Sequence, residues 1–152
     1  MTEQDTTGPE TLAAAGWIVA HNGTPGYTTR LHAGVHTVVA DEPAAVGGND
    51  EGPTPYDLLL ASIGACTAMT LRMYARRKQW PVDEVIVAFR TARSHATDCE
   101  ECVDHPSAIG ALRLERRLEL RGALTDEQRA RLTAIADRCP VKLALQRGIE
   151  IL

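Results

Sequence analysis

A stretch without a single charged residue, 58–71, constrains the fold of this chain more than any other feature. Its residues are Leu, Ala, Ile, Ser, Gly, Thr, Met and one Cys, so they are apolar or small on every face. The run is too short to span a bilayer, and its composition is typical of a helix buried inside a protein. The sequence therefore predicts a long buried central helix that carries Cys66.

Both ends of this helix carry recognisable signals. Thr54 suits the N-cap, Pro55 suits the first helical position, and Asp57 occupies the acidic position of a capping box. Cations crowd residues 72–78, where they complement the helix dipole, and Pro81 prevents the helix from continuing. These signals define both ends of the predicted helix to within a few residues.

Length and charge limit the class of protein. A chain of 152 residues suits one domain with a real core, which we expect over 12–152, preceded by a disordered tail at 1–11. The net charge of −4 gives no reason to expect nucleic acid or an anionic membrane as a partner. The first residues are polar and acidic and lack the apolar segment of a signal peptide, so we expect a cytoplasmic location.

The rest of the chain alternates between strand and helix patterns. Strands are predicted at 15–20, 27–31, 35–40, 82–93, 111–121 and 149–152, helices at 125–138 and 141–147, a Gly-rich acidic loop at 46–53 and a polar loop at 94–107. Asn22-Gly23 and Pro25-Gly26 indicate a hairpin between the first two strands. The order of strands, long helix, strands, helix and strand indicates an α+β fold with a mainly antiparallel sheet.

One charged residue contradicts the alternation within strand 111–121. Leu118 and Leu120 fall on an apolar face and Glu119 on the polar face, but Arg116 also falls on the apolar face. Either a bulge resets the register of the strand, or the charge points inward at a site. The sequence leaves both interpretations open.

The cysteines are the candidates for chemistry. In a reducing compartment Cys66, Cys99, Cys102 and Cys139 are thiols at rest, which favours reactivity or metal binding over structural disulfides. A cysteine in a buried helix is usually a small apolar residue, although the small neighbours of Cys66 leave room for another molecule. Cys139 directly precedes Pro140 and so lies near a helix N-cap, where unpaired N–H groups favour the thiolate. Neither feature alone identifies a function.

Two motifs together carry a family resemblance: Gly-Pro-Thr-Pro-Tyr-Asp-Leu-Leu-Leu-Ala-Ser-Ile-Gly-Ala-Cys at 52–66 and Arg-Cys-Pro-Val at 138–141. From about residue 17 to the end, the chain resembles the OsmC/Ohr family of small bacterial thiol peroxidases. The pairing of these motifs at this separation is specific. The resemblance implies that Cys66 is the peroxidatic cysteine, which reduces an organic hydroperoxide, and that Cys139 resolves it.

The same resemblance implies an architecture and partners. The expected fold is OsmC-like α+β, with mainly antiparallel sheets around a long buried central helix, in an intertwined homodimer with its active sites at the subunit interface. The expected function is reduction of organic hydroperoxides in oxidative-stress defence. The implied reductant is a dithiol, with lipoyl groups as the family's source, and no metal or organic cofactor is implied.

The sequence departs from the family's pattern at the acid that supports catalysis. In organic hydroperoxide resistance proteins this acid directly follows the proline, a position occupied here by Tyr56. Asp57 comes one residue later, and nine residues at about 100° each place it about 180° from Cys66 on a straight helix. Asp57 is therefore either a helix cap alone or a cap that also serves the site.

The activating arginine of the family is missing as well. The hairpin turn that carries it in the peroxidases is Asn-Gly-Thr-Pro-Gly at 22–26 in this chain. Arg30 and Arg116 are candidates to replace it, but neither stands at a matching position. This departure motivates a second hypothesis, in which the chain is a binding or stress-response protein on the same fold with weak peroxidase activity.

A second constellation, His95-x3-Cys99-x2-Cys102 with His105 nearby, supports a third hypothesis. Two thiolates spaced as Cys-x2-Cys are half of a common zinc site, and the two histidines are candidates for the remaining ligands. A second Cys-x2-Cys is absent, so the pair is equally interpretable as a redox pair or as two loop cysteines. The third hypothesis is a metal-binding protein that uses this segment.

Overall fold

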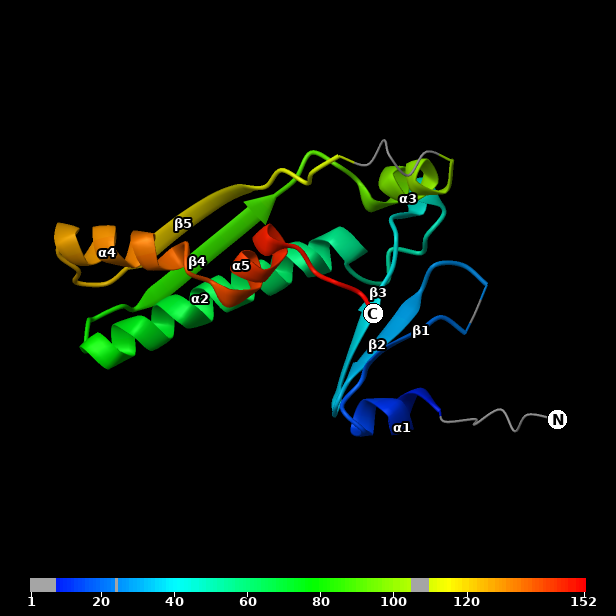
Figure 1. Cartoon of the computed structure of the whole chain (residues 1–152), viewed down its shortest axis with the longest axis horizontal. Coiled ribbons are helices and arrows are strands. Elements are labelled where there is room, and N and C mark those ends of the chain that lie inside the picture. The colour runs from blue at the N-terminus through cyan, green and yellow to red at the C-terminus, as the bar shows by residue number, and fades with distance from the viewer. Residues whose placement is uncertain (1–7, 24, 105–109) are drawn as a thin grey trace. The chain divides into compact units, whose positions relative to one another are not determined.

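A computed structural model describes residues 8–23, 25–104 and 110–152. Its fold is α+β with antiparallel sheets, as the sequence predicts. Figure 1 labels the helices and strands. The chain divides into two compact units: a first unit of Met1–Asp57 with His95–Ala108, and a second unit of Leu58–Ser94 with Ile109–Leu152.

The first unit is built on an antiparallel sheet with the strand order β1-β2-β3. Its elements are α1 (Pro9–Ala14), β1 (Ile18–His21), β2 (Thr29–Ala33), β3 (His36–Ala40), the short 3-10 turn η1 (Ala44–Val46) and α3 (His95–Asp104). The side-chain amide of Asn22 donates to the carbonyl oxygens of Gly26 and Thr28, which closes the predicted hairpin between β1 and β2.

Helix α1 differs from the sequence expectation. The sequence assigns 1–11 to a disordered tail, but a helix begins at Pro9, packs against β1 and β2, and buries Ala13. Proline at the first helical position is well tolerated, since the N–H that it lacks would have no partner there. Residues 1–7 of the predicted tail lie outside the described residues.

The loop after β3 folds back on the end of that strand. Asp41 is buried, and its carboxylate accepts hydrogen bonds from Thr28 Oγ1 at 3.0 Å and from the backbone N–H of Glu42 at 2.8 Å. Gly48 approaches so closely that a Cβ there would overlap the Glu42 carbonyl oxygen, which also accepts from the N–H of Asp50 at 3.1 Å. The Gly-rich loop therefore holds the backbone of Glu42 in place.

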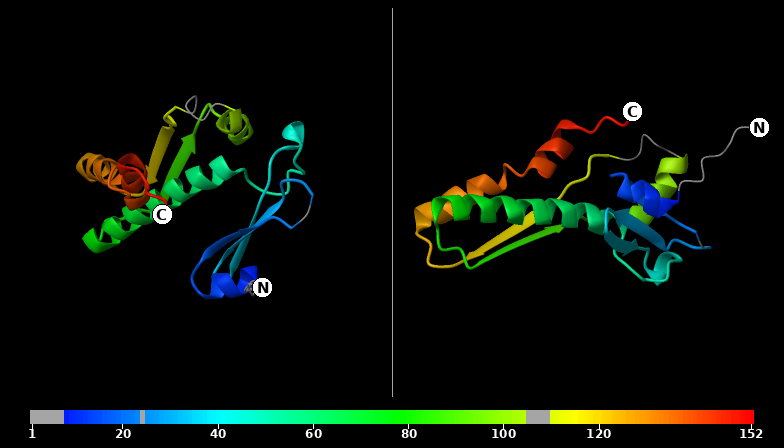
Figure 2. Two further views of the ribbon diagram at one scale, coloured as in Figure 1. Left: turned by 45° about the vertical axis from the view of Figure 1, so that its right-hand side comes forward. Right: turned by 90° about the horizontal axis from the view of Figure 1, so that it is seen from below.

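The second unit packs helices against one face of an antiparallel strand pair. Its elements are α2 (Pro55–Lys78, whose first turn is counted with the first unit), β4 (Glu84–Arg90), β5 (Glu115–Arg121), α4 (Asp126–Ala136) and α5 (Pro140–Arg147). Figure 2 shows α2 lying along both strands. The buried core is contributed mainly by α2 and α4, with Val85, Leu118 and Leu120 of the strands packed against it: Leu71, Ala75, Val82, Leu132, Ile135 and Ala136.

The predicted long helix is confirmed, and so is its capping box. The backbone N–H of Thr54 donates to Asp57 Oδ2 at 3.0 Å, and the N–H of Asp57 donates to Thr54 Oγ1 at 3.2 Å. In the single chain, α2 is buried along one face only. The buried residues of α2 recur every four positions, whereas Met69 is 64% exposed and Met73 is 71% exposed.

By length and composition α2 is also apolar enough to cross a membrane. Its stripe of residues in the core of the second unit, however, makes it a core helix of the fold. The apolar surface that it leaves uncovered is available to another molecule.

Two further predictions are wrong. The segment 94–107, expected as a loop, contains α3, whose polar residues are held by contacts with other parts of the first unit. Residues 149–152 form no strand, because Gly148 turns the chain after α5 with a φ of 92° and no strand partner follows in the described chain.

The alternative left open for Arg116 is resolved. The register of β4 with β5 is continuous, with Phe89 opposite Arg116 and Val87 opposite Leu118, so β5 contains no bulge. Arg116 therefore points its charge to the same face as the apolar residues of the strand.

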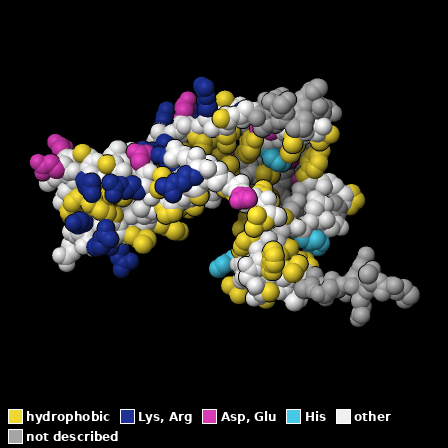
Figure 3. All heavy atoms as spheres, viewed as in Figure 1, with side chains coloured by type: hydrophobic (Ala, Val, Ile, Leu, Met, Phe, Trp, Pro, Cys, Tyr) yellow, Lys and Arg dark blue, Asp and Glu magenta, His cyan; other side chains and the backbone are white. Residues whose placement is uncertain are grey.

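Positive charge is concentrated at one end of the second unit. Figure 3 shows Lys and Arg side chains gathered over the region of α4 and the end of α2. Arg76, Arg77 and Lys78 form the last turn of α2, where cations stabilise the helix dipole as the sequence predicts.

Candidate functional site

Cys66 and Cys139 lie together in the second unit. Cys139 is the N-cap residue of α5 and is fully buried, with Sγ 3.8 Å from the carbonyl oxygen of Ile63 on α2. Cys66 lies three residues further along the same helix, and its thiol is near enough to lower the pKa of Cys139. Two cysteines separated by more than seventy residues in sequence are thus neighbours in space.

The surroundings of Cys139 favour its thiolate. Burial on its own raises the pKa of this thiol, because a charge is poorly solvated in the interior. Hydrogen bonds from the backbone N–H groups of Lys142 and Val141 and from the side chains of Thr67 and Cys66 outweigh burial, and the pKa of Cys139 is lowered. The helix N-terminus begun by Pro140 supplies the backbone donors, as the Cys-Pro sequence predicts.

Cys66 is the more accessible of the two cysteines. It is half-buried and lines an open groove of about 780 Å³ on the surface of the second unit. Most of the groove is apolar, and Ala65, Met69 and Met73 of α2 line it together with Ile135 of α4. A small apolar molecule can therefore reach Cys66 from the groove, whereas Cys139 is covered.

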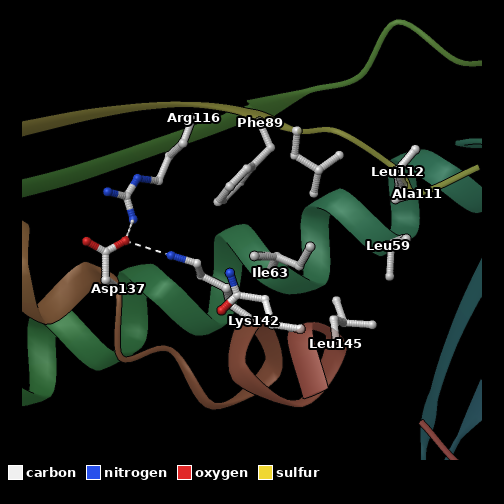
Figure 4. A pocket seen from close by; sticks show the side chains of 11 residues that line it. Leu59, Ile63, Phe89, Ala111, Leu112, Arg116, Asp137, Lys142 and Leu145 are labelled. Carbon is white, nitrogen blue, oxygen red and sulfur yellow. Dashed lines mark hydrogen bonds and ion pairs between the residues drawn. The ribbon is translucent and has the colours of Figure 1, made fainter. Parts of the chain in front are cut away.

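A second cavity, of about 840 Å³, lies beside the same helices (Figure 4). One end is apolar and is lined by Leu59, Phe89 and Leu145 among others. The other end carries Arg116 and Lys142, which both donate to Asp137. This arrangement of an apolar chamber with charges at one end suits an amphipathic ligand.

Asp137 holds the two cations in place. Its Oδ1 accepts from Lys142 Nζ at 2.6 Å and from Arg116 Nη1 at 3.0 Å. The hydrogen bond from Lys142 is the strongest influence and lowers the pKa of Asp137; burial opposes it, and Arg116 lowers the pKa further. Arg116 is thereby an arginine held by an acid, in the unit that contains both cysteines.

The other residues singled out in the sequence have simpler surroundings. Asp57 Oδ2 accepts from the N–H of Thr54 and, at 2.7 Å, from Thr54 Oγ1, so its carboxylate serves the helix cap. Arg30 is exposed on β2 in the first unit.

The proposed metal-binding segment is only partly assembled. Cys99 Sγ lies 3.2 Å from His95 Nε2, while both Cys99 and Cys102 are exposed. In the part of the chain that the structure describes, no three His, Cys, Asp or Glu side chains are arranged to hold a metal ion. His105, the fourth proposed ligand, lies outside the described residues.

Sequence reasoning missed several partners of the candidate residues. Glu42 contacts His95 through the histidine Nδ1, Thr67 contacts Cys139, and Asp137 contacts Arg116. Each pair joins segments far apart in the chain, so no motif spacing reveals it. Only the spacing within α2 gives a local indication: Thr67 is adjacent to Cys66 and four residues after Ile63, which places Thr67 on the same helix face as Ile63.

Comparison with known proteins adds a family match. A family model described as OsmC-like protein matches residues 47–152. None of the curated proteins matches the sequence.

Solved structures of similar fold cover most of the chain. An OsmC like protein from Mycoplasma pneumoniae is 18% identical with a TM-score of 0.67, covering 86% of this chain and 86% of that chain. Organic hydroperoxide resistance proteins from Elizabethkingia anophelis (22% identical, TM-score 0.61, covering 88% and 91%) and Legionella pneumophila (20%, 0.56, covering 86% and 88%) are also similar. At these identities the likeness concerns the fold.

Proposed function

The chain belongs to the OsmC-like protein family, and from that premise we propose that it is a thiol-dependent peroxidase that reduces organic hydroperoxides through Cys66 and Cys139. The observation that carries the proposal is the contact of these two cysteines, one open to a groove and the other buried with a lowered pKa. Solved relatives named as organic hydroperoxide resistance proteins support the substrate class.

The chemistry proceeds in two steps. The Cys66 thiolate attacks the peroxide oxygen that carries hydrogen, the O–O bond breaks, and the alkoxide leaves as an alcohol after taking a proton. Cys66 is then a sulfenic acid. The Cys139 thiolate attacks the Cys66 sulfur, hydroxide leaves as water, and a Cys66–Cys139 disulfide forms. A dithiol such as a lipoyl group returns both cysteines to thiols.

Cys139 also compensates for the missing arginine of the family. Its thiolate is stabilised by backbone and side-chain donors, and the Cys66 thiol is one of those donors. When Cys66 attacks the peroxide, Cys139 is therefore positioned to accept the proton that Cys66 gives up and to pass it to the departing alkoxide, which leaves Cys139 as the thiolate needed for the second step. Arg116, held by Asp137, belongs to the adjoining cavity rather than to the groove.

The groove favours a hydrophobic substrate and a second subunit. Methionine and alanine side chains line the groove around Cys66, and such an apolar lining suits an alkyl hydroperoxide better than hydrogen peroxide. Met69 and Met73 are mostly exposed in the single chain, so a second copy packed on this face of α2 would both bury them and close the groove. We expect the homodimer to form through this face, and a cytoplasmic dithiol to be the reductant.

The dimer is tested separately from the chemistry. Met73→Glu places a charge on the exposed face of α2 and should convert the dimer to monomer in sedimentation equilibrium. Val35→Glu introduces the same charge at an exposed apolar position of the first unit and serves as the control. A wild-type chain that sediments as a monomer contradicts the dimer.

The decisive experiment is intact mass spectrometry of the reduced protein after one equivalent of cumene hydroperoxide. The protein should lose two hydrogens, and peptide mapping should locate the disulfide between Cys66 and Cys139. Cys139→Ser should trap a sulfenic acid on Cys66, and Cys66→Ser should not react at this site. If Cys66 stays reduced while Cys99 and Cys102 are oxidised, the proposal is wrong.

The role of Asp57 is tested by comparing two variants of the same cap. Thr54→Ala and Asp57→Asn each remove part of the capping box and should destabilise the protein by about 1 kcal/mol. If Asp57 only caps the helix, both variants should retain the same rate of Cys66 oxidation. A slower oxidation in Asp57→Asn alone would assign the carboxylate to the catalytic site.

A second candidate function follows from the missing arginine. Without it, the chain would be a binding or stress-response protein on the same fold, with its apolar groove and cavity as ligand sites. In that case Cys66 should react with cumene hydroperoxide no faster than an ordinary cysteine. The rate of Cys66 oxidation in single turnover therefore distinguishes the two functions.

A further inference from the structure

The first unit contains an arrangement of acid, imidazole and thiol that the peroxidase chemistry does not use. His95, the first residue of α3, places Nδ1 against the carboxylate of Glu42, whose side chain is only 10% exposed. An ionised carboxylate only accepts hydrogen bonds, so Nδ1 must carry the proton. In the neutral ring Nε2 then has a free lone pair.

That lone pair faces a thiol. Cys99 Sγ lies 3.2 Å from Nε2, because four residues separate His95 and Cys99 on α3 and such residues are neighbours on one helix face. The imidazole can therefore accept the proton of Cys99 and become an imidazolium ion paired with Glu42. A nucleophile beside a base that is oriented by a third group is the general design of an activated nucleophile.

The histidine is held from more than one side. The ring of Tyr56 packs edge-on against it, with the ring centres 5.8 Å apart. The backbone of Glu42 is fixed by the close approach of Gly48 and by the N–H of Asp50. His95 is thus fixed in orientation with its basic nitrogen toward Cys99.

We propose that Glu42, His95 and Cys99 form a second thiol site, at which Cys99 undergoes thiol–disulfide exchange with low-molecular-weight disulfides and Cys102 completes the reaction. Cys102 follows one turn later, and both cysteines are exposed, so a disulfide reaches them from solvent. The site is independent of the peroxidase proposal, because it shares no residue with Cys66 and Cys139.

The exchange balances without another oxidant. The Cys99 thiolate attacks one sulfur of the disulfide, the S–S bond breaks, and the departing thiolate takes the proton held by His95. The Cys102 thiol loses a proton to solvent and attacks Cys99, which releases the second thiol after protonation. Each disulfide is thereby reduced to two thiols while Cys99 and Cys102 are oxidised to one disulfide.

The geometry of α3 permits that disulfide after a local change. Residues three apart on a helix have Cβ atoms about 5–6 Å apart, whereas a disulfide requires about 3.5–4.5 Å. Cys102 lies in the last turn of α3, where small backbone changes cost least. A metal ion is the competing occupant, but no three His, Cys, Asp or Glu side chains among the described residues are arranged to hold one.

The test uses Cys66→Ser/Cys139→Ser protein, in which the peroxidase cysteines are absent, so its outcome is separate from that of the proposed function. In this background Cys99 alone (with Cys102→Ser) and Cys102 alone (with Cys99→Ser) react with 4,4′-dithiodipyridine, followed by stopped-flow absorbance. Cys99 should react at least about tenfold faster than Cys102. With both present, the product should be a Cys99–Cys102 disulfide by mass.

His95→Gln and Glu42→Gln identify the cause of the faster reaction. His95→Gln should bring the Cys99 rate down to that of Cys102, and Glu42→Gln should lower it partway, while the Cys102 rate should not change in either variant. Loss of folding would alter both cysteines, so the ratio of the two rates distinguishes positioning from misfolding.

Three results would overturn the proposal. Equal rates for the two cysteines would show that His95 does not activate Cys99. An unchanged rate ratio in His95→Gln would do the same. Zinc recovered at one equivalent per chain and lost in Cys99→Ser would assign the segment to metal binding.

Discussion

The two pairs of cysteines in this chain are built in opposite ways. Cys66 and Cys139 come from helices far apart in sequence and meet beneath the surface of the second unit. Cys99 and Cys102 lie one turn apart on α3 in the first unit, and both are exposed. The contrast shows how one chain can place its thiols in two physically different settings.

The difference lies in what contacts each sulfur. Burial raises the pKa of Cys139, but N–H, O–H and S–H donors outweigh it by stabilising the thiolate, whereas the thiol form donates to the Ile63 carbonyl oxygen. The partner of Cys99 is a ring nitrogen, which takes up a proton only when the sulfur gives it up. A buried thiolate surrounded by hydrogen-bond donors suits attack on the sulfenic acid of the neighbouring cysteine. An exposed thiol–imidazole pair suits reaction with soluble disulfides.

The largest effect should come from removing the pairs one at a time. Cys66→Ser/Cys139→Ser should reduce the consumption of cumene hydroperoxide by about a thousandfold or more, because the nucleophile is lost. Cys99→Ser/Cys102→Ser should leave that rate within about twofold, since exposed substitutions away from a site are usually mild. Peroxide decay in the presence of excess dithiol measures both.

The opposite result is expected with 4,4′-dithiodipyridine. Cys99→Ser/Cys102→Ser should lose the fast reaction with this disulfide, and Cys66→Ser/Cys139→Ser should keep it. Loss of peroxide turnover in both double variants would show that the pairs act in one pathway and would end the distinction between them.

The next effect concerns the donors around Cys139. Thr67→Val keeps the shape of the side chain but removes the hydroxyl that contacts Cys139, so the pKa of Cys139 should rise toward its ordinary value. Loss of a hydrogen bond to a charged sulfur should raise the pKa of Cys139 and slow disulfide formation near neutral pH by up to about tenfold. Absorbance of the thiolate at 240 nm against pH reports the pKa.

A matched control exists one turn along the same helix. Thr70 donates to the carbonyl of Cys66 at 2.8 Å, as Thr67 donates to that of Ile63, but it is not among the hydrogen-bond partners of Cys139. Thr70→Val should leave the pKa of Cys139 unchanged. Equal shifts in both variants would indicate a general change in α2 instead.

The sequence predicted local structure well wherever a signal lay within one turn or one strand. The capping box of Thr54 with Asp57 and the alternation of β4 and β5 are confirmed in the structure. The prediction was wrong at α3, because the contacts of His95 and Asp98 with other segments outweigh the loop-like polarity of that stretch.

The candidate site was less predictable for the same reason. Only the family resemblance suggested that Cys66 and Cys139 meet, since no spacing rule connects residues on different helices. Glu42 ends a strand in an ordinary turn sequence, and nothing local marks it as the partner of His95. The apolar composition of α2 did not reveal which of its faces the single chain buries, because all of its faces are apolar or small.

The buried carboxylate of Asp41 should make the stability of the first unit depend on pH. Burial tends to raise the pKa of Asp41, but hydrogen bonds from the Glu42 backbone, the Thr28 hydroxyl and the loop backbone outweigh it and lower the pKa. A lowered pKa contributes stability that is full above the unfolded value near 3.8 and is lost as pH falls through the folded value. Asp41→Asn should therefore lower the melting temperature by several degrees at pH 7, with little difference from wild type at the acid end.

The same change should affect only one pair of cysteines. Because Asp41 anchors the backbone of Glu42, Asp41→Asn should slow Cys99 and leave the Cys66–Cys139 disulfide rate unchanged. Asp50→Asn alters an exposed acid of the same loop and should have neither effect. A change in the Cys66 rate would mean that the two sites are coupled.

The smallest effect is expected at Asp137, the carboxylate that supports the second unit. The hydrogen bond from Lys142, opposed by burial and assisted by Arg116, lowers its pKa, so its contribution is also present above the unfolded value near 3.8 and disappears as pH falls through the folded value. Its side chain is 54% exposed, and solvent screening limits the contribution to about 0.5 kcal/mol. Asp137→Asn should lower the free energy of unfolding by that amount in dilute buffer and by almost nothing in about 1 M salt, where charges are screened within about 3 Å.

Asp41→Asn should be nearly insensitive to salt, since buried backbone donors hold that carboxylate. Urea unfolding at both salt concentrations measures the difference, and equal salt dependence in the two variants would show that the two carboxylates are held by the same kind of interaction.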